Sequence, residues 1–196
     1  MNKPLLSAAV LTALAGSVYG QARITAPFGP GGTWNVYEAN PNAMGWTSAS
    51  NYANSQVFAS APGHLVSVHS ADENTLAFNL AGGGDIWIGL FDNPAVLPTL
   101  RPDQQAAIAA LPAAQQPAET GTPAEGSNLV PTGQGSWAWT SGEPFTYANW
   151  SGGEPNNFAS DESVAHIGGA QTWNDNSANL GIDPANGDAR NFQVGH

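Results

Sequence analysis

The sequence predicts an α+β domain, in which two helices precede a series of short strands. In the stretch 46–60, apolar residues recur four positions apart, which is the spacing of one face of a helix. A second helix is indicated at 70–81, where Ser70 and Glu73 form a capping box. Later in the chain, short apolar runs alternate with loops that are rich in glycine and other turn residues.

We expect strands where apolar or β-branched residues lie between turn-forming residues. The clearest example is DIWIGL at 85–90, which follows three glycines and is predicted to be a buried strand. The other expected strands cover 33–39, 64–68, 136–140, 163–168, 171–174 and 190–194.

The stretch 92–135 differs in composition from the rest of the chain, because it is rich in Pro, Ala, Gln and Thr. We interpret it as an insertion rather than as part of the core. Within it, RPDQQAAIAAL at 101–111 predicts a short helix with Pro102 in its first turn.

The first 22 residues have the layout of a secretory signal peptide, with Lys3, an apolar run from Leu5 to Val18 and then small residues. This run is shorter than a membrane-spanning helix requires, and no other stretch of the chain is long enough. We therefore expect a signal peptide at 1–22 and a mature domain at 23–196 that is secreted or periplasmic.

The chain has 196 residues, of which 15 are acidic and 4 basic, and it has no cysteine. Removal of the signal peptide would also remove Lys3 and leave a charge of 3 − 15, or −12. This charge argues against nucleic acid and anionic membranes as partners. Because disulfides are excluded, the loops must be held by the core or by a bound metal.

The stretch NWSGGEPNNFASDE, at 149–162, concentrates side-chain oxygens in a chain with few charged residues. It carries three carboxylates and three side-chain amides, and no basic residue. This composition is typical of a solvated turn. Carboxylate and amide oxygens are also the ligands that a hard cation such as Ca²⁺ prefers. The stretch alone is compatible with both interpretations.

Four motifs appear in the order found in C-type lectin-like domains: GHLVSVHSADEN, WIGL, WAWTSGEPFTYANWSGGEPNN and WND. The chain resembles this family, in a bacterial and cysteine-free form, over about 34–194 apart from the expected insertion. Ser163 stands where the family pattern has a cysteine. The resemblance implies two helices, two small antiparallel sheets and a long loop that binds calcium.

The resemblance also implies the calcium ligands. Glu154 and Asn156 would each supply a side-chain oxygen from either side of a cis Pro155. Asn174 and Asp175, in the WND motif, would complete most of the site. The auxiliary calcium site of the family is not expected, because non-acidic residues replace its acids at Val130, Gln134 and Asn157.

A fifth calcium ligand is expected from an acid between the two motifs, and two residues compete for this position. Alignment on Ser163 and Val164 gives Asp161, whereas counting forward from Glu154 gives Glu162. The register of the following strand favours Asp161.

In the family, two neighbouring sugar hydroxyls bind the calcium ion and form hydrogen bonds with its ligands. The resemblance therefore implies a secreted, calcium-dependent lectin that binds sugars of the mannose, glucose, N-acetylglucosamine or fucose type, for which EPN is typical. Multivalent assembly would strengthen such binding. The implied sugar-binding residues are Glu154, Asn156, Asp161, Asn174 and Asp175. The alternative is an extracellular domain that contacts protein or ice, in which calcium only braces the loop.

An enzyme is not expected, because the sequence has neither G-x-S-x-G nor a phosphate-binding loop. The histidines lack the spacing of a zinc site. The tryptophans could form a sugar-stacking platform, but most are expected in the core: Trp46, Trp87, Trp139, Trp150 and Trp173.

Overall fold

The computed structural model describes residues 23–29, 32–42, 44–58, 60–118 and 137–178, together with the backbone of residues 190–195. The expected signal peptide and the last part of the expected insertion lie outside these residues. Among the described helices, none has the length and apolar character needed to cross a lipid bilayer.

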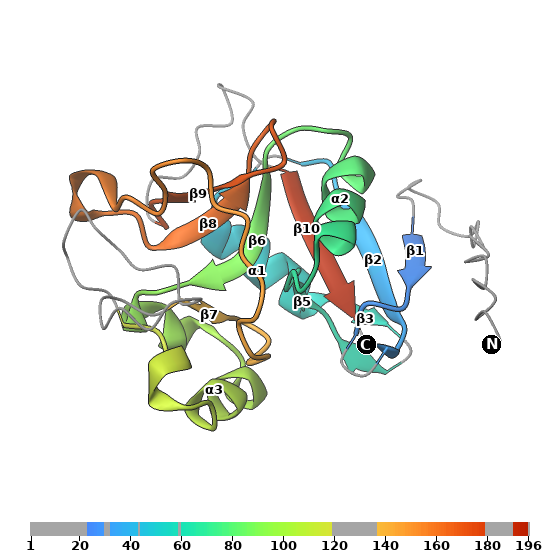
Figure 1. Cartoon of the computed structure of the whole chain (residues 1–196). Coiled ribbons are helices and arrows are strands. Elements are labelled where there is room, and N and C mark those ends of the chain that lie inside the picture. The colour runs from blue at the N-terminus through green and yellow to red at the C-terminus, as the bar shows by residue number, and fades with distance from the viewer. Residues whose placement is uncertain are drawn as a thin grey trace, which may run out of the picture.

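Most strands join one sheet with the order β1–β2–β10–β6–β8–β9 (Figure 1). Additional pairs are formed by β5 with β10 and by β7 with β6, while β3 and β4 form a separate hairpin. The contact between β10 and β6 is parallel and joins two antiparallel groups of strands. The strands are β1 Arg23–Ala26, β2 Asn35–Asn40, β3 Val57–Phe58, β4 Ala61–Pro62, β5 His64–Leu65, β6 Ile86–Phe91, β7 Ala138–Trp139, β8 Val164–Ile167, β9 Trp173–Asn176 and β10 Arg190–Gly195.

The α-helices are α1 Trp46–Ser55, α2 Ala71–Leu80 and α3 Pro102–Ala109, and the 3-10 helices are η2 Pro94–Thr99, η3 Ala113–Gln115 and η4 Phe158–Ser160. The α+β class is confirmed. The N-cap predicted for α2 is also confirmed, because the Glu73 N–H donates to Ser70 Oγ at 3.1 Å. The expected helix at 46–60 was too long, because Val57 belongs to β3 and is 64% exposed.

The central strand β6 divides the core into two parts. Successive side chains of a strand point to opposite faces. Ile86, Ile88 and Leu90 pack in a cluster with residues of α2, whereas Trp87 and Phe91 pack in a second cluster with residues of α1. All of β6 is buried, which confirms the prediction for this strand. Burial of each large side chain stabilises the fold by roughly 1.5–3 kcal/mol, in a chain without disulfides.

The structure corrects the expectation that the Pro- and Ala-rich stretch stands apart from the core. Its first part contains η2 and α3, and the helix expected there is confirmed. Arg101, just before α3, donates through Nη1 to Asn54 Oδ1 at 2.8 Å and to the Gly63 carbonyl at 2.6 Å. Three apolar residues of this stretch are buried in the cluster that also contains residues of α1: Val96, Leu100 and Ile108.

Candidate functional site

The start of the segment 149–162 is held along the beginning of β9 by backbone hydrogen bonds. The Trp173 N–H donates to the Asn149 carbonyl at 2.7 Å, and the Ser151 N–H donates to the Trp173 carbonyl at 2.8 Å. This pairing brings the EPN turn next to the WND residues, although about twenty positions separate the two motifs.

Glu154 and Asn156 point toward one another from either side of Pro155. The Glu154–Pro155 peptide bond is cis, as the resemblance implied. Asn156 Nδ2 donates a hydrogen bond to Glu154 Oε2. Both side chains are half-buried, so their oxygens remain partly accessible from solvent.

Asp175 is fully buried behind the EPN turn and fixes its backbone. Its Oδ1 accepts from the Asn156 N–H at 3.2 Å, and its Oδ2 accepts from the Asn157 N–H at 2.7 Å. Asn174 precedes it on β9 and donates through Nδ2 to the Asp175 carbonyl at 2.5 Å. The structure therefore brings the two motifs together as the resemblance implied.

The two candidates for the fifth ligand differ in their surroundings. Asp161 is exposed, and its Oδ2 accepts from Ser177 Oγ at 3.0 Å, beyond the end of β9. Glu162 is half-buried, and its Oε2 accepts from the Phe158 N–H at 2.6 Å. The Glu162 N–H also donates to Asn157 Oδ1 at 3.2 Å, which ties this residue to the EPN turn.

No model of a known protein family matches the sequence. Over 113 residues, or 58% of the chain, the sequence is 27% identical to the low affinity immunoglobulin epsilon Fc receptor of Mus musculus. Over 50 residues, or 24% of the chain, it is 42% identical to the C-type lectin lectoxin-Lio3 of Erythrolamprus poecilogyrus. These matches span 23% and 31% of the two relatives, so the chain corresponds to only a part of each.

Among solved structures, the fold is similar to that of the C-type lectin CEL-I from Cucumaria echinata. The TM-score is 0.54 at 23% identity, over 83% of this chain and 90% of that one. The cow C-type carbohydrate-recognition domain of CD23, in the presence of a GlcNAc2Man3 oligosaccharide, gives a TM-score of 0.50 at 22% identity, over 82% and 85% of the two chains. The chain folds as a C-type lectin-like domain.

Two carboxyl groups of this C-type lectin-like domain, those of Glu154 and Glu162, have raised pKa values. Burial raises the pKa of Glu162 to about 7, although the hydrogen bond from the Phe158 N–H partly opposes this increase. The charges of Asp175, Glu154 and Asp161 act in the same direction as burial. Burial also raises the pKa of Glu154, and the hydrogen bond and charge of Asp175 add to this effect. Neighbouring acids therefore add to the effect of burial on both carboxyl groups.

These residues fit a hard cation. No lysine or arginine lies between residues 149 and 178 to balance the acids, and a dication would remove the repulsion between them. Within the described part of the chain, no group of three or more His, Cys, Asp or Glu side chains lies close enough together to hold a metal ion. A calcium site would therefore also depend on the amide oxygens of Asn156 and Asn174, which are suitable ligands for Ca²⁺.

The C-type lectin-like domain also presents a residue that the sequence interpretation did not single out. Phe158 directly follows the EPN turn, and 74% of its surface is exposed. The sequence could have indicated this residue, because Phe158 is an aromatic residue within a stretch of acids and turn-forming residues. By contrast, the prediction that tryptophans lie in the core is confirmed for Trp46, Trp87, Trp139 and Trp173, which are at most 1% exposed, while Trp150 is half-buried.

The auxiliary calcium site was not expected, and the structure describes one of the three residues involved. Asn157 is 1% exposed, and its backbone N–H and its side-chain oxygen are both engaged within the turn. Val130 and Gln134 lie outside the described residues.

Proposed function

We propose that the chain is a calcium-dependent carbohydrate-binding domain, with the ion held between the EPN turn and the WND residues of β9. The observation that carries this proposal is the mutual contact of Glu154, Asn156 and Asp175. These oxygen-bearing groups come from two segments of a C-type lectin-like fold: Glu154 and Asn156 are half-buried, and Asp175 is buried beneath them. No lysine or arginine lies nearby in the sequence. Such a set of oxygens suits Ca²⁺, which accepts irregular geometry.

Four of the proposed ligands come from the two motifs: Glu154, Asn156, Asn174 and Asp175. For the fifth, the surroundings favour Glu162 over Asp161. The charges of Glu154 and Asp175 act on the Glu162 carboxyl, as expected if its oxygens face the same space. The Asp161 side chain is exposed and hydrogen-bonded to Ser177. Magnesium fits this set less well, because it requires near-ideal octahedral geometry.

The same residues can recognise a sugar. Bound Ca²⁺ would offer coordination positions to two adjacent hydroxyls. The amides of Asn156 and Asn174 can donate hydrogen bonds to these hydroxyls, and the carboxylates of Glu154 and Glu162 can accept them. By resemblance, the EPN order of acceptor and donor favours mannose-type sugars. The cow CD23 domain, studied with an oligosaccharide that contains mannose, has a similar fold.

We also propose that the protein acts outside the cytoplasm, in keeping with the signal-like beginning of the sequence. Single sites of this kind bind weakly, since a millimolar dissociation constant corresponds to only about −4 kcal/mol. Several domains acting together would increase the avidity without any new contact.

A glycan array, probed with the protein in calcium and in chelator, tests this function. We expect mannose-type glycans to be bound in calcium and lost in chelator. Sugar binding that survives the chelator would remove calcium from the proposal and point to exposed aromatic residues. Absence of glycan binding, together with a calcium-dependent melting temperature, would favour a domain in which calcium only braces a protein- or ice-contacting loop.

A further inference from the structure

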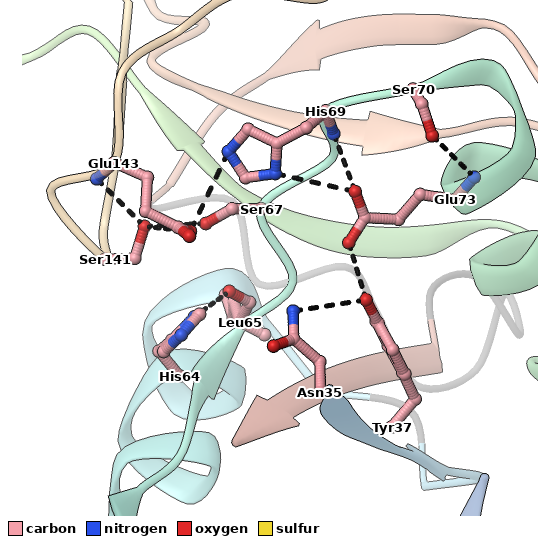
Figure 2. Close-up of polar contacts among 10 residues, drawn as sticks. All are labelled: Asn35, Tyr37, His64, Leu65, Ser67, His69, Ser70, Glu73, Ser141 and Glu143. Carbon is pink, nitrogen blue, oxygen red and sulfur yellow. Dashed lines mark hydrogen bonds and ion pairs between the residues drawn. The ribbon is translucent and has the colours of Figure 1, made fainter. Parts of the chain in front are cut away.

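A second group of polar side chains, which shares no residue with the candidate calcium site, centres on His69 (Figure 2). His69 precedes α2, and its ring lies between two carboxylates from different parts of the chain. Nδ1 is 3.5 Å from Oε2 of Glu73, on α2, and Nε2 is 3.8 Å from Oε2 of Glu143, which follows β7. The side chain of His69 is 23% exposed, so it can exchange protons with solvent.

Both carboxylates are held in place by other donors. Glu73 is fully buried, and it accepts from the Tyr37 hydroxyl at 2.7 Å and from the His69 backbone N–H at 2.8 Å. Glu143 Oε2 accepts from Ser141 Oγ at 2.8 Å, and Ser141 Oγ is 2.7 Å from Ser67 Oγ. The imidazole therefore lies between two acceptors whose positions are fixed by other hydrogen bonds, with one ring nitrogen facing each.

Neutral and protonated histidine satisfy these acceptors differently. A neutral imidazole has one N–H, so one of its two nitrogens must present a lone pair to a carboxylate. An imidazolium has two N–H groups and can donate toward Glu73 and Glu143 together. Among the described residues, the Trp139 ring, at 6.1 Å between centroids, and the serines beside Glu143 also belong to this group, and they carry no charge.

We propose that His69 acts as a proton-operated clamp that joins the start of α2 to the segment 141–150. This segment follows β7 and leads directly into the EPN turn. At low pH, the imidazolium bridges Glu73 and Glu143, and the segment is held against α2. At higher pH, the loss of one proton releases the Glu143 side of the bridge, while Glu73 keeps its other donors.

The direction of the pH effect follows from the surroundings of His69. Burial disfavours the charged ring and acts to lower its pKa, but the hydrogen bond to Glu73 and the charges of Glu143 and Glu73 outweigh burial, so the pKa is raised. A histidine whose pKa is raised on folding contributes stability at low pH, below its unfolded pKa. This contribution is lost as the pH rises through the folded pKa.

Hydrogen exchange of the calcium-free full-length protein, compared at about pH 5.5 and pH 8 after correction for intrinsic rates, tests the clamp. We expect the protection of residues 141–150 to fall by about two- to fivefold at the higher pH, as for an ion pair of this exposure. Glu143→Gln keeps the shape of the side chain but removes its charge. In this variant the pH dependence should disappear, and the pKa of His69, measured by NMR, should fall toward its ordinary value of about 6.5.

His166→Gln is the matched control, because it removes another partly buried histidine, on β8, whose ring packs against Trp87. The pH dependence of residues 141–150 should persist in this variant. An unchanged His69 pKa in Glu143→Gln, or equal pH dependence in Glu143→Gln and wild type, would overturn the clamp. The chelator is present throughout, so the result does not depend on whether the chain binds calcium.

Discussion

Asn74 on α2 and Trp173 on β9, which are 99 positions apart, are joined by a hydrogen bond of 2.7 Å from the indole Nε1 to Asn74 Oδ1. Asn74 Nδ2 donates in turn to the Gln171 carbonyl at 2.8 Å. Asn74 is 2% exposed and Trp173 is fully buried. The Asn74 amide therefore ties both Gln171 and Trp173, at the start of β9 and beside Asn174, to the second helix.

Asn74→Ala should destabilise the protein by about 1–3 kcal/mol, because it leaves the buried indole N–H of Trp173 without its acceptor. The Gln171 carbonyl loses one of its two donors and keeps the one from Asn149 Nδ2, at 2.7 Å. Urea unfolding at neutral pH measures the change. Thr75→Ala is the matched control, since Thr75 is exposed and its hydroxyl bonds Gln171 Oε1 at 3.3 Å. We expect this control to change stability by at most about 0.5 kcal/mol. Equal effects of the two substitutions would contradict the role assigned to Asn74.

Much of the fold could be predicted from the sequence because local signals and tertiary packing agree. The Ser70 cap of α2 formed as expected. The carboxylate of Glu73, however, does not return to Ser70 as in a full capping box; it bonds Tyr37 and the His69 N–H. Val57 fits the helical period of α1, yet Val57 pairs with Pro62 in a hairpin instead. In both cases a contact with a residue outside the helix decided the local conformation.

The chemistry of the candidate site was also visible in the sequence, as a run of oxygen-bearing residues without a base. The choice between Asp161 and Glu162 as the proposed fifth ligand was not, because it depends on the path of the turn. Asn157, Ala159 and Ser160 all have positive φ values, of 45°, 59° and 58°. Such conformations are uncommon for residues other than glycine. The presence of alanine or serine in a sequence therefore does not predict them. These backbone torsions determine where the side chains of Asp161 and Glu162 point. Counting residues from Glu154 or from Ser163 could not predict this orientation.

Glu162→Gln should weaken calcium binding by at least about tenfold, the range found when even the groups that support metal ligands are removed. Asp161→Asn, which removes the neighbouring charge, should have the smaller effect. Calorimetric titration of both variants with calcium gives the comparison. A larger loss in Asp161→Asn would instead assign the fifth ligand to Asp161.

Without calcium, Glu162→Gln should be at least as stable as wild type at about pH 8. The folded pKa of Glu162 is raised to about 7, first by burial. A raised pKa favours folding at low pH, and this contribution is lost as the pH rises through about 7. Thermal unfolding in chelator measures the difference. A marked loss of stability in the variant at this pH would show that the carboxylate braces the turn without a metal.

Calcium should stabilise the wild-type protein at neutral pH, and the gain should disappear on acidification. The ligands bind metal in their deprotonated form. At 100 times its dissociation constant, calcium would add about 2.7 kcal/mol, a large part of a typical total of ~5–15 kcal/mol. Melting curves with calcium and with chelator test this expectation. Curves that coincide at pH 7 would remove calcium from the proposed function.

Phe158→Ala should weaken glycan binding while leaving calcium affinity and stability nearly unchanged, because the ring is exposed beside the EPN turn. Aromatic rings contribute contact area and a flat face to bound ligands. The matched control is Val57→Ala, which removes another exposed apolar side chain, on β3. Glycan titrations in saturating calcium should separate the two variants, and equal affinities would remove Phe158 from the sugar site.

The substitution of Glu154→Gln together with Asn156→Asp gives the sharpest test of sugar recognition. The double change keeps the net charge and the side-chain sizes, so calcium should still bind. It exchanges the acceptor and the donor on either side of Pro155, and thereby reverses the hydrogen-bonding pattern presented to two sugar hydroxyls. A site that pairs with specific hydroxyls penalises a mismatch, because its polar groups are left without partners.

We expect the double variant to lose affinity for mannose far more than it loses stability. A millimolar site has only about −4 kcal/mol of binding free energy, so a loss of even ~1.5 kcal/mol would make binding hard to detect. Titrations of wild type and variant with mannose and galactose, in saturating calcium, provide the measurement. If neither protein binds either sugar while calcium still raises the melting temperature, the lectin function fails and the calcium-braced contact domain replaces it.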